Sequence, residues 1–203
     1  MPISEIGLLK LKSSKSVDDA DLRARMNEIT VGLQAFTGYP FYFLQQVKDP
    51  SFIYLLGEWE SLDQHYKGLH GLPDFKQLVL TMSQFFEFQW MAHYDFKMDE
   101  ADLNAELLEV ARFTMDQSRR AEFATKAGLV VQKLDDHLGK NKTVTGWKVD
   151  QQREKEEFVV LVPWKDAQQR IEVGETEAGV EYGKLNDFSE EVEIQHIRLL
   201  KDL

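Results

Sequence analysis

Two histidines with a tyrosine between them lie in the stretch 57–75. They are His65 and His70, and the tyrosine is Tyr66. Histidine is the side chain whose ordinary pKa lies closest to neutral pH, so it is well suited to moving protons. The group therefore predicts an acid–base site, with His70 as the main acid or base and His65 assisting it. The alternative interpretation is that both histidines are exposed residues at a helix end.

The spacing of these histidines argues against a metal site. Two histidines four residues apart share one helix face, whereas His65 and His70 are five apart. The chain has no cysteine, which excludes disulfides and thiolate ligands. The sequence also has no phosphate-binding glycine loop and no nucleophile elbow. We therefore expect neither a metal nor another cofactor.

Further candidates lie on the apolar segment 52–59, which is predicted to be a strand. Tyr54 and Glu58 share one face of it, and Tyr54 would enter the pocket of His70 if the even-numbered face points to the helices. Tyr54 is therefore a third predicted catalytic residue. The predicted substrate-binding residues are Tyr66, Trp59, Glu58, Phe75 and Tyr42. For each aromatic residue the alternative is ordinary core packing.

The first half of the chain predicts the element order β-α-β-β-α-β, which is the ferredoxin-like unit. Leu22, Met26, Ile29 and Leu33 recur at helical spacing. Ser61 and Gln64 fit a capping box at the start of the second helical segment. The predicted strands span 5–12, 41–47, 52–59 and 90–97.

The second half repeats this order, which indicates an internal duplication. Trp59 and Trp164 are 105 positions apart, and His93 and His196 are 103 apart. We predict two domains, 1–100 and 101–203. A histidine at equivalent places in both copies is interpreted as structural, at a sheet–sheet interface. Arg170 stands 105 positions after His65. The second copy thus lacks the histidine pair, which favours one site per chain.

The predicted strand 52–59 is apolar on both faces, so both faces should be covered. The predicted fold is therefore α+β, with two tandem ferredoxin-like repeats packed sheet to sheet as a pseudo-dimeric α+β barrel and with helices outside.

The chain resembles the dimeric α+β barrel superfamily, in particular antibiotic biosynthesis monooxygenase (ABM)-like domains, as a tandem copy. The resembling segments are Gly57-Glu58-Trp59, Glu60-Ser61-Leu62-Asp63, the helix up to His70, and Leu72-Pro73-Asp74-Phe75. The resemblance implies a pocket between a sheet and its own helices. It also implies a pseudo-dimer within the chain and leaves a further homodimer open.

Members of this superfamily include cofactor-free quinone-forming monooxygenases, polyketide cyclases, haem-degrading enzymes, chlorite dismutase relatives and stress proteins. In haem-degrading relatives a histidine occupies the position of Val79, which disfavours haem here.

Composition limits the partners. The formal net charge is -11 at pH 7, and such a surface repels nucleic acid and anionic membranes. No segment has the length of a membrane span or of a signal peptide, so a cytoplasmic protein is expected.

The predicted function is a small cofactor-independent enzyme, namely a cyclase, isomerase or monooxygenase. Its substrate would be a hydrophobic, aromatic or polyketide-like molecule. The alternative is a non-catalytic small-molecule-binding or stress-related protein.

Overall fold

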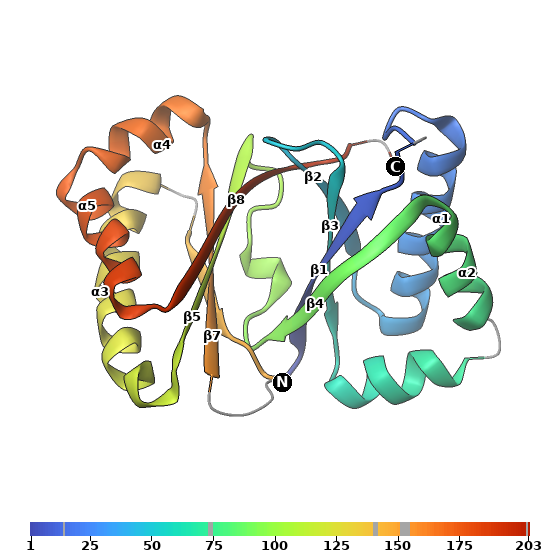
Figure 1. Cartoon of the computed structure of the whole chain (residues 1–203), viewed down its shortest axis with the longest axis horizontal. Coiled ribbons are helices and arrows are strands. Elements are labelled where there is room, and N and C mark those ends of the chain that lie inside the picture. The colour runs from blue at the N-terminus through green and yellow to red at the C-terminus, as the bar shows by residue number, and fades with distance from the viewer. Residues whose placement is uncertain (14, 73–74, 140–141, 151–154, 202) are drawn as a thin grey trace. The chain divides into compact units, whose positions relative to one another are not determined.

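The computed structural model describes residues 1–13, 15–72, 75–139, 142–150, 155–201 and 203. The chain divides into two compact units: the first comprises Met1–Met98 with Leu199–Leu203, and the second comprises Asp99–Arg198. Both units mix helices with antiparallel strands, so the fold belongs to the α+β class (Figure 1). Among the described helices, none combines the length and the apolar character that a membrane crossing requires.

The first unit contains a four-stranded antiparallel sheet in the order β4-β1-β3-β2. Its strands are β1 (Ile3–Leu11), β2 (Phe41–Gln46), β3 (Phe52–Trp59) and β4 (Phe86–Tyr94). The central strand β1 pairs with β3 on one side and with β4 on the other. Helices α1 (Ala20–Thr37) and α2 (Phe75–Phe85) lie on one face of this sheet (Figure 1).

The helical stripe predicted from the sequence forms the buried side of α1. Leu22, Met26, Ile29 and Leu33 are buried there and pack in one core with odd-numbered strand residues. Those strand residues include Phe41, Phe43, Ile53, Leu55 and Trp59. The helix ends at Gly38, whose φ of 83° lies in the left-handed region that glycine adopts without strain. In β1, β2 and β3 the odd-numbered face is therefore the face that the helices cover.

The segment after β3 differs from an ordinary α-helix. Residues Gln64–Gly68 form a π-helical turn, and Leu69–Gly71 form a 3-10 turn. The backbone N–H of Gln64 donates to Ser61 Oγ at 3.2 Å, as the capping box predicts. The Gln64 side chain, however, accepts from the backbone N–H of Glu60 at 2.8 Å rather than from that of Ser61. Pro73 and Asp74, which belong to a segment that resembles ABM-like domains, lie outside the described residues.

The second unit contains an antiparallel sheet in the order β8-β5-β7-β6. Its strands are β5 (Leu107–Asp116), β6 (Val144–Trp147), β7 (Lys155–Trp164) and β8 (Glu191–Leu199). Helices α3 (Arg120–Leu138), α4 (Ala167–Gly174) and α5 (Glu177–Gly183) lie on one face of this sheet (Figure 1). The chain between β7 and β8 thus forms two short helices, α4 and α5, and a final 3-10 turn, Lys184–Phe188. The packing of the two sheets face to face stays a prediction.

Candidate functional site

A buried carboxylate lies at the centre of the first unit. Glu5 of β1 is directly opposite Gly57 of β3 and His93 of β4. The indole N–H of Trp59 donates to Glu5 Oε2 at 2.9 Å, and His93 Nε2 lies 3.4 Å from the same oxygen. A buried carboxylate is costly unless hydrogen bonds or positive charge compensate it, so these neighbours are what the fold supplies to hold it.

His65 reaches the same carboxylate from the π-helical turn. Its Nε2 lies 3.7 Å from Glu5 Oε2, and its ring centroid is 4.4 Å from that of Trp59 and 4.9 Å from that of His93. His65 is buried, as are Glu5 and His93. One ligand-type atom from each of these three residues lies within 4.8 Å of the other two. Segments far apart in the sequence therefore meet in one polar cluster.

A cavity of about 500 Å³ adjoins this cluster, between the sheet of the first unit, the π-helical turn and α2. Its walls are mostly apolar, and Leu9, Leu55, Leu78, Met82 and Phe86 are among the side chains that line them. The polar lining comes mainly from Glu5, His65, Tyr66 and His70. A volume of a few hundred Å³ with a few convergent polar groups is typical of a small-molecule site.

Four of the predicted site residues line this cavity: His65, His70, Tyr66 and Phe75. The ring of His70 stacks on that of Phe75 with centroids 4.3 Å apart, and it is 5.8 Å from the ring of His65. His70 is exposed, whereas His65 is buried. The change from a π-helical turn to a 3-10 turn between them brings both histidines to one wall of the cavity although they are five residues apart.

The expectation that Tyr54 joins His70 is wrong. The helices cover the odd-numbered face of β3, and alternate residues of a strand point to opposite faces, so Tyr54 and Glu58 point away from the cavity. The Tyr54 ring packs edge to face with Trp90, and the Glu58 carboxylate accepts from the backbone N–H of Met98 at 2.8 Å.

Two other predicted substrate-binding residues also lie outside the lining. Tyr42 is opposite Leu56 in the β2–β3 pair, which places it on the same even-numbered face. Trp59 is on the helix side but contributes by holding Glu5, as described above.

Sequence reasoning missed Glu5 and misplaced His93. We expected His93 at a sheet–sheet interface, but its side chain faces Glu5 and His65 on the side of the helices. One signal was available in the sequence. Glu109 follows Glu5 by 104 positions, which is close to the spacings of 105 and 103 that separate the two tryptophans and the two histidines. A carboxylate repeated within two apolar strands is more informative than either carboxylate alone.

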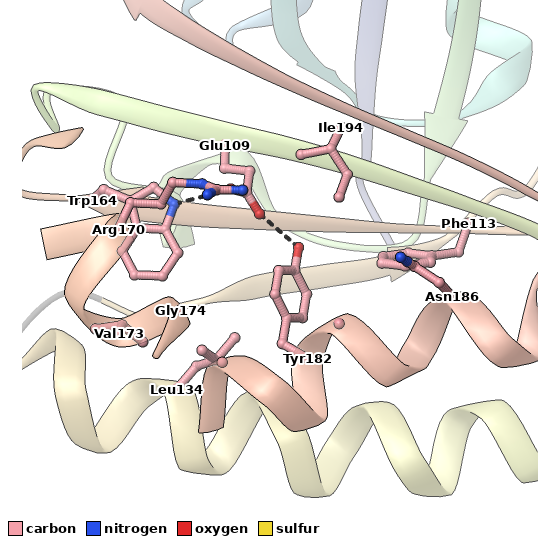
Figure 2. A pocket seen from close by; sticks show the side chains of 12 residues that line it. Glu109, Phe113, Leu134, Trp164, Arg170, Val173, Gly174, Tyr182, Asn186 and Ile194 are labelled. Atoms are coloured by element: carbon pink, nitrogen blue, oxygen red, sulfur yellow. Dashed lines mark hydrogen bonds and ion pairs between the residues drawn. The ribbon is translucent and has the colours of Figure 1, made fainter. Parts of the chain in front are cut away.

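The second unit has a smaller pocket of about 240 Å³ at the corresponding place. Arg170, Tyr182 and Asn186 are among its lining residues, together with apolar side chains such as Leu134 and Val173. Figure 2 shows the Tyr182 hydroxyl directed at the Glu109 carboxylate across this pocket.

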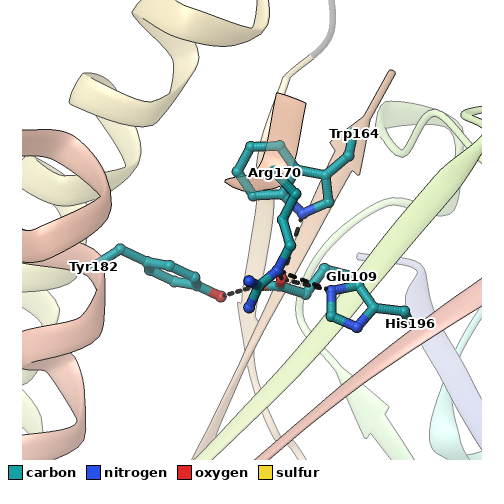
Figure 3. A network of polar contacts seen from close by, with 5 residues as sticks. All are labelled: Glu109, Trp164, Arg170, Tyr182 and His196. Atoms are coloured by element: carbon teal, nitrogen blue, oxygen red, sulfur yellow. Dashed lines mark hydrogen bonds and ion pairs between the residues drawn. The ribbon is translucent and has the colours of Figure 1, made fainter. Parts of the chain in front are cut away.

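Glu109 is the centre of a dense polar network (Figure 3). Its Oε2 accepts from Trp164 Nε1 at 3.4 Å and from Arg170 Nε at 3.1 Å, and it lies 3.0 Å from His196 Nε2. Its Oε1 accepts from the Tyr182 hydroxyl at 2.9 Å. The Glu109 carboxylate therefore has partners on both oxygens and a guanidinium beside it.

This network determines the charge states of Glu109 and Tyr182. Burial alone would raise the pKa of Glu109, but hydrogen bonds from His196 and Tyr182 and the charge of Arg170 outweigh burial and lower the pKa. Burial and the adjacent carboxylate raise the pKa of Tyr182 well above its ordinary value. Glu109 is therefore ionised and Tyr182 is a neutral donor at neutral pH.

The two clusters have the same residue types at three corresponding positions and differ at a fourth. Glu5, Trp59 and His93 correspond to Glu109, Trp164 and His196, and in both sheets the glutamate is directly opposite the histidine. Where the second unit has Arg170, the first has His65. The second cluster therefore contains its own permanent cation, whereas the first presents two imidazoles beside a larger cavity.

Comparison with known proteins places the fold among solved structures. No family model matches the chain, and no curated protein matches it in sequence. A provisionally assigned monooxygenase from Fusobacterium nucleatum subsp. nucleatum is 12% identical with a TM-score of 0.66, over 98% of this chain and 93% of that one. An anthrone oxidase-like protein is 11% identical with a TM-score of 0.68, over 98% and 91%.

A chlorite dismutase variant from Candidatus Nitrospira defluvii is also similar, at 6% identity and a TM-score of 0.59, over 98% of this chain and 90% of that one. At such identities the likeness shows a shared α+β fold alone. The class defined here is therefore an α+β protein whose first unit contains a cavity bordered by histidines.

Proposed function

We propose that the chain is a small-molecule oxidase or monooxygenase of the ABM-like group, built from two tandem ferredoxin-like repeats, and that the first repeat contains its site. The observation that carries this proposal is the apolar cavity of about 500 Å³ with His65, His70 and Tyr66 in its wall. The fold shared with the provisionally assigned monooxygenase and with the anthrone oxidase-like protein supports it.

The proposed substrate is an aromatic or polyketide-like molecule with a phenol or an activated methylene group. His70 takes up the proton of that group, and His65, at the polar end of the cavity, orients the resulting anion by donating a hydrogen bond to it. The apolar walls enclose the ring system and exclude water. With O₂ as oxidant, a methylene becomes a carbonyl: one oxygen atom enters the substrate and the other leaves as water with the two hydrogens.

The proposed reaction is free of haem, in keeping with one residue of the cavity. Val79 stands where the haem-degrading relatives have their histidine, and it lines the cavity as an apolar side chain. No step of the proposed reaction uses haem.

The test is oxygen uptake with a hydroxylated anthrone as the probe. His70→Ala should lower turnover by about 10²–10⁴-fold, the range of general acid–base catalysis, with little change in melting temperature because His70 is exposed. His137→Ala is the matched control, because His137 is exposed at the end of α3. Turnover of His70→Ala within twofold of wild type would contradict the proposed role. Tight binding of the probe without oxygen uptake in wild type would instead favour the non-catalytic binding protein.

A further inference from the structure

We propose that Glu5, His65 and His93 form a binding site for a divalent first-row transition ion, such as Fe²⁺ or Zn²⁺. The proposal concerns the same cavity as the proposed function, but it stands on the geometry of the three side chains. It departs from the expectation of no metal, which considered only the spacing of His65 and His70. Ligands supplied by β1, β4 and the π-helical turn cannot be recognised from a spacing along one helix.

The distances suit a shared ion. Glu5 Oε2 lies 3.4 Å from His93 Nε2 and 3.7 Å from His65 Nε2. Imidazole nitrogens and carboxylate oxygens bind such ions at about 2.0–2.2 Å, which places two ligands of one ion roughly 3.0–3.6 Å apart. One ligand-type atom of each residue lies within 4.8 Å of the other two, so small side-chain rotations bring all three to an ion.

The ligand set and its surroundings point to a site with open positions. Two imidazoles and one carboxylate are a combination found in catalytic zinc sites and in non-haem iron oxygenases. Glu5 and His65 line the cavity, so a ligand in the cavity has access to the ion. The Trp59 indole N–H orients the Glu5 carboxylate at 2.9 Å, as outer partners of metal ligands do.

The second unit provides an internal comparison. Arg170 Nε lies 3.1 Å from Glu109 Oε2 and 3.1 Å from His196 Nε2, so a guanidinium lies against both the carboxylate and the imidazole, which are themselves 3.0 Å apart (Figure 3). At the corresponding position the first unit has His65, a neutral ligand type. The same arrangement of glutamate and histidine thus receives a side-chain cation in one unit and presents a third ligand in the other.

The test is titration of the chelator-treated protein with Co²⁺, followed by its visible absorption, and with Zn²⁺ by calorimetry. We expect one ion per chain. Glu5→Gln, His65→Ala and His93→Ala should each weaken binding at least about 100-fold, and Trp59→Phe should weaken it about 10–100-fold. The matched controls in the second unit, Glu109→Gln and His196→Ala, should leave wild-type affinity and stoichiometry unchanged.

Two exchanges between the units make the test decisive. His65→Arg copies the second cluster into the first, so the variant should fold and lose the ion. Arg170→His copies the first cluster into the second, so binding should rise to two ions per chain. Absence of binding to wild type, or undiminished binding in folded His65→Arg, would overturn the proposal. His70→Ala should retain the ion while losing turnover, which separates a failure of this site from a failure of the proposed oxidation.

Discussion

Replacement of Tyr182 by phenylalanine removes one hydroxyl from the network around Glu109. That hydroxyl donates to Glu109 Oε1 at 2.9 Å, and Glu109 is buried. A hydrogen bond to a charged group contributes about 1.5–3 kcal/mol. Because Arg170, His196 and Trp164 still contact the other oxygen, the carboxylate keeps partners. We therefore expect Tyr182→Phe to lower the free energy of unfolding by about 2 kcal/mol at pH 7.

The effect should depend on pH in a defined direction. The pKa of Glu109 is lowered in the folded protein from its ordinary value of 4.5. The unfolded chain therefore takes up the proton at a higher pH than the folded chain does. The stability that the network contributes is complete above pH 4.5 and is lost as pH falls through the lower, folded pKa. The difference between Tyr182→Phe and wild type should be largest at neutral pH and should shrink below pH 4.5.

Urea unfolding at pH 7 and at several values down to pH 4 measures both predictions. Tyr39→Phe, in the loop after α1, is the control and should change the free energy of unfolding by less than about 0.5 kcal/mol. A Tyr182→Phe effect as small as that of the control would refute the assigned role of the hydroxyl. An effect that grows as pH falls would refute the direction of the pKa shift.

Two further substitutions test the packing around the cavity. A Cβ at Gly7 would meet only Leu55 atoms at 3.7 Å and 3.9 Å, so Gly7→Phe should fold and place its ring in the cavity. Probe affinity in a fluorescence titration should fall at least tenfold, and unchanged affinity would contradict the assignment of the cavity. A Cβ at Gly57 would lie 2.1 Å from the ring of Phe41, which packs against Trp59. Gly57→Ala should therefore lower the free energy of unfolding by about 1–3 kcal/mol, and a neutral result in urea would contradict this close approach.

Local signals predicted much of the first unit. The strand Phe52–Trp59 and the stripe on α1 follow from the apolar pattern of the sequence. The face of β3 could not be predicted in the same way. An apolar strand buried on both sides carries no alternation to show which face meets the helices. That is why Tyr54 was assigned to the wrong side of the sheet.

The cluster of Glu5, His65 and His93 could not be predicted from local sequence patterns, for a different reason. Glu5 and His93 meet through the pairing of β1 with β4, which joins residues far apart in the sequence. His65 reaches them only because the turn after β3 is π-helical, and a capping box does not distinguish this turn from an α-helix. The repeat of glutamate, tryptophan and histidine in both halves is the signal that links these positions.

The most direct measurement is a crystal structure of the protein grown with the anthrone probe or its quinone product. The central claim is that the first unit contains the functional site. In the second unit the corresponding carboxylate, Glu109, is paired with Arg170 instead. We predict electron density for the ligand in the cavity beside α2, with a polar ligand atom within hydrogen-bond distance of His65 or His70. Density in the pocket beside Arg170 and Tyr182, with none in the cavity of the first unit, would contradict the claim.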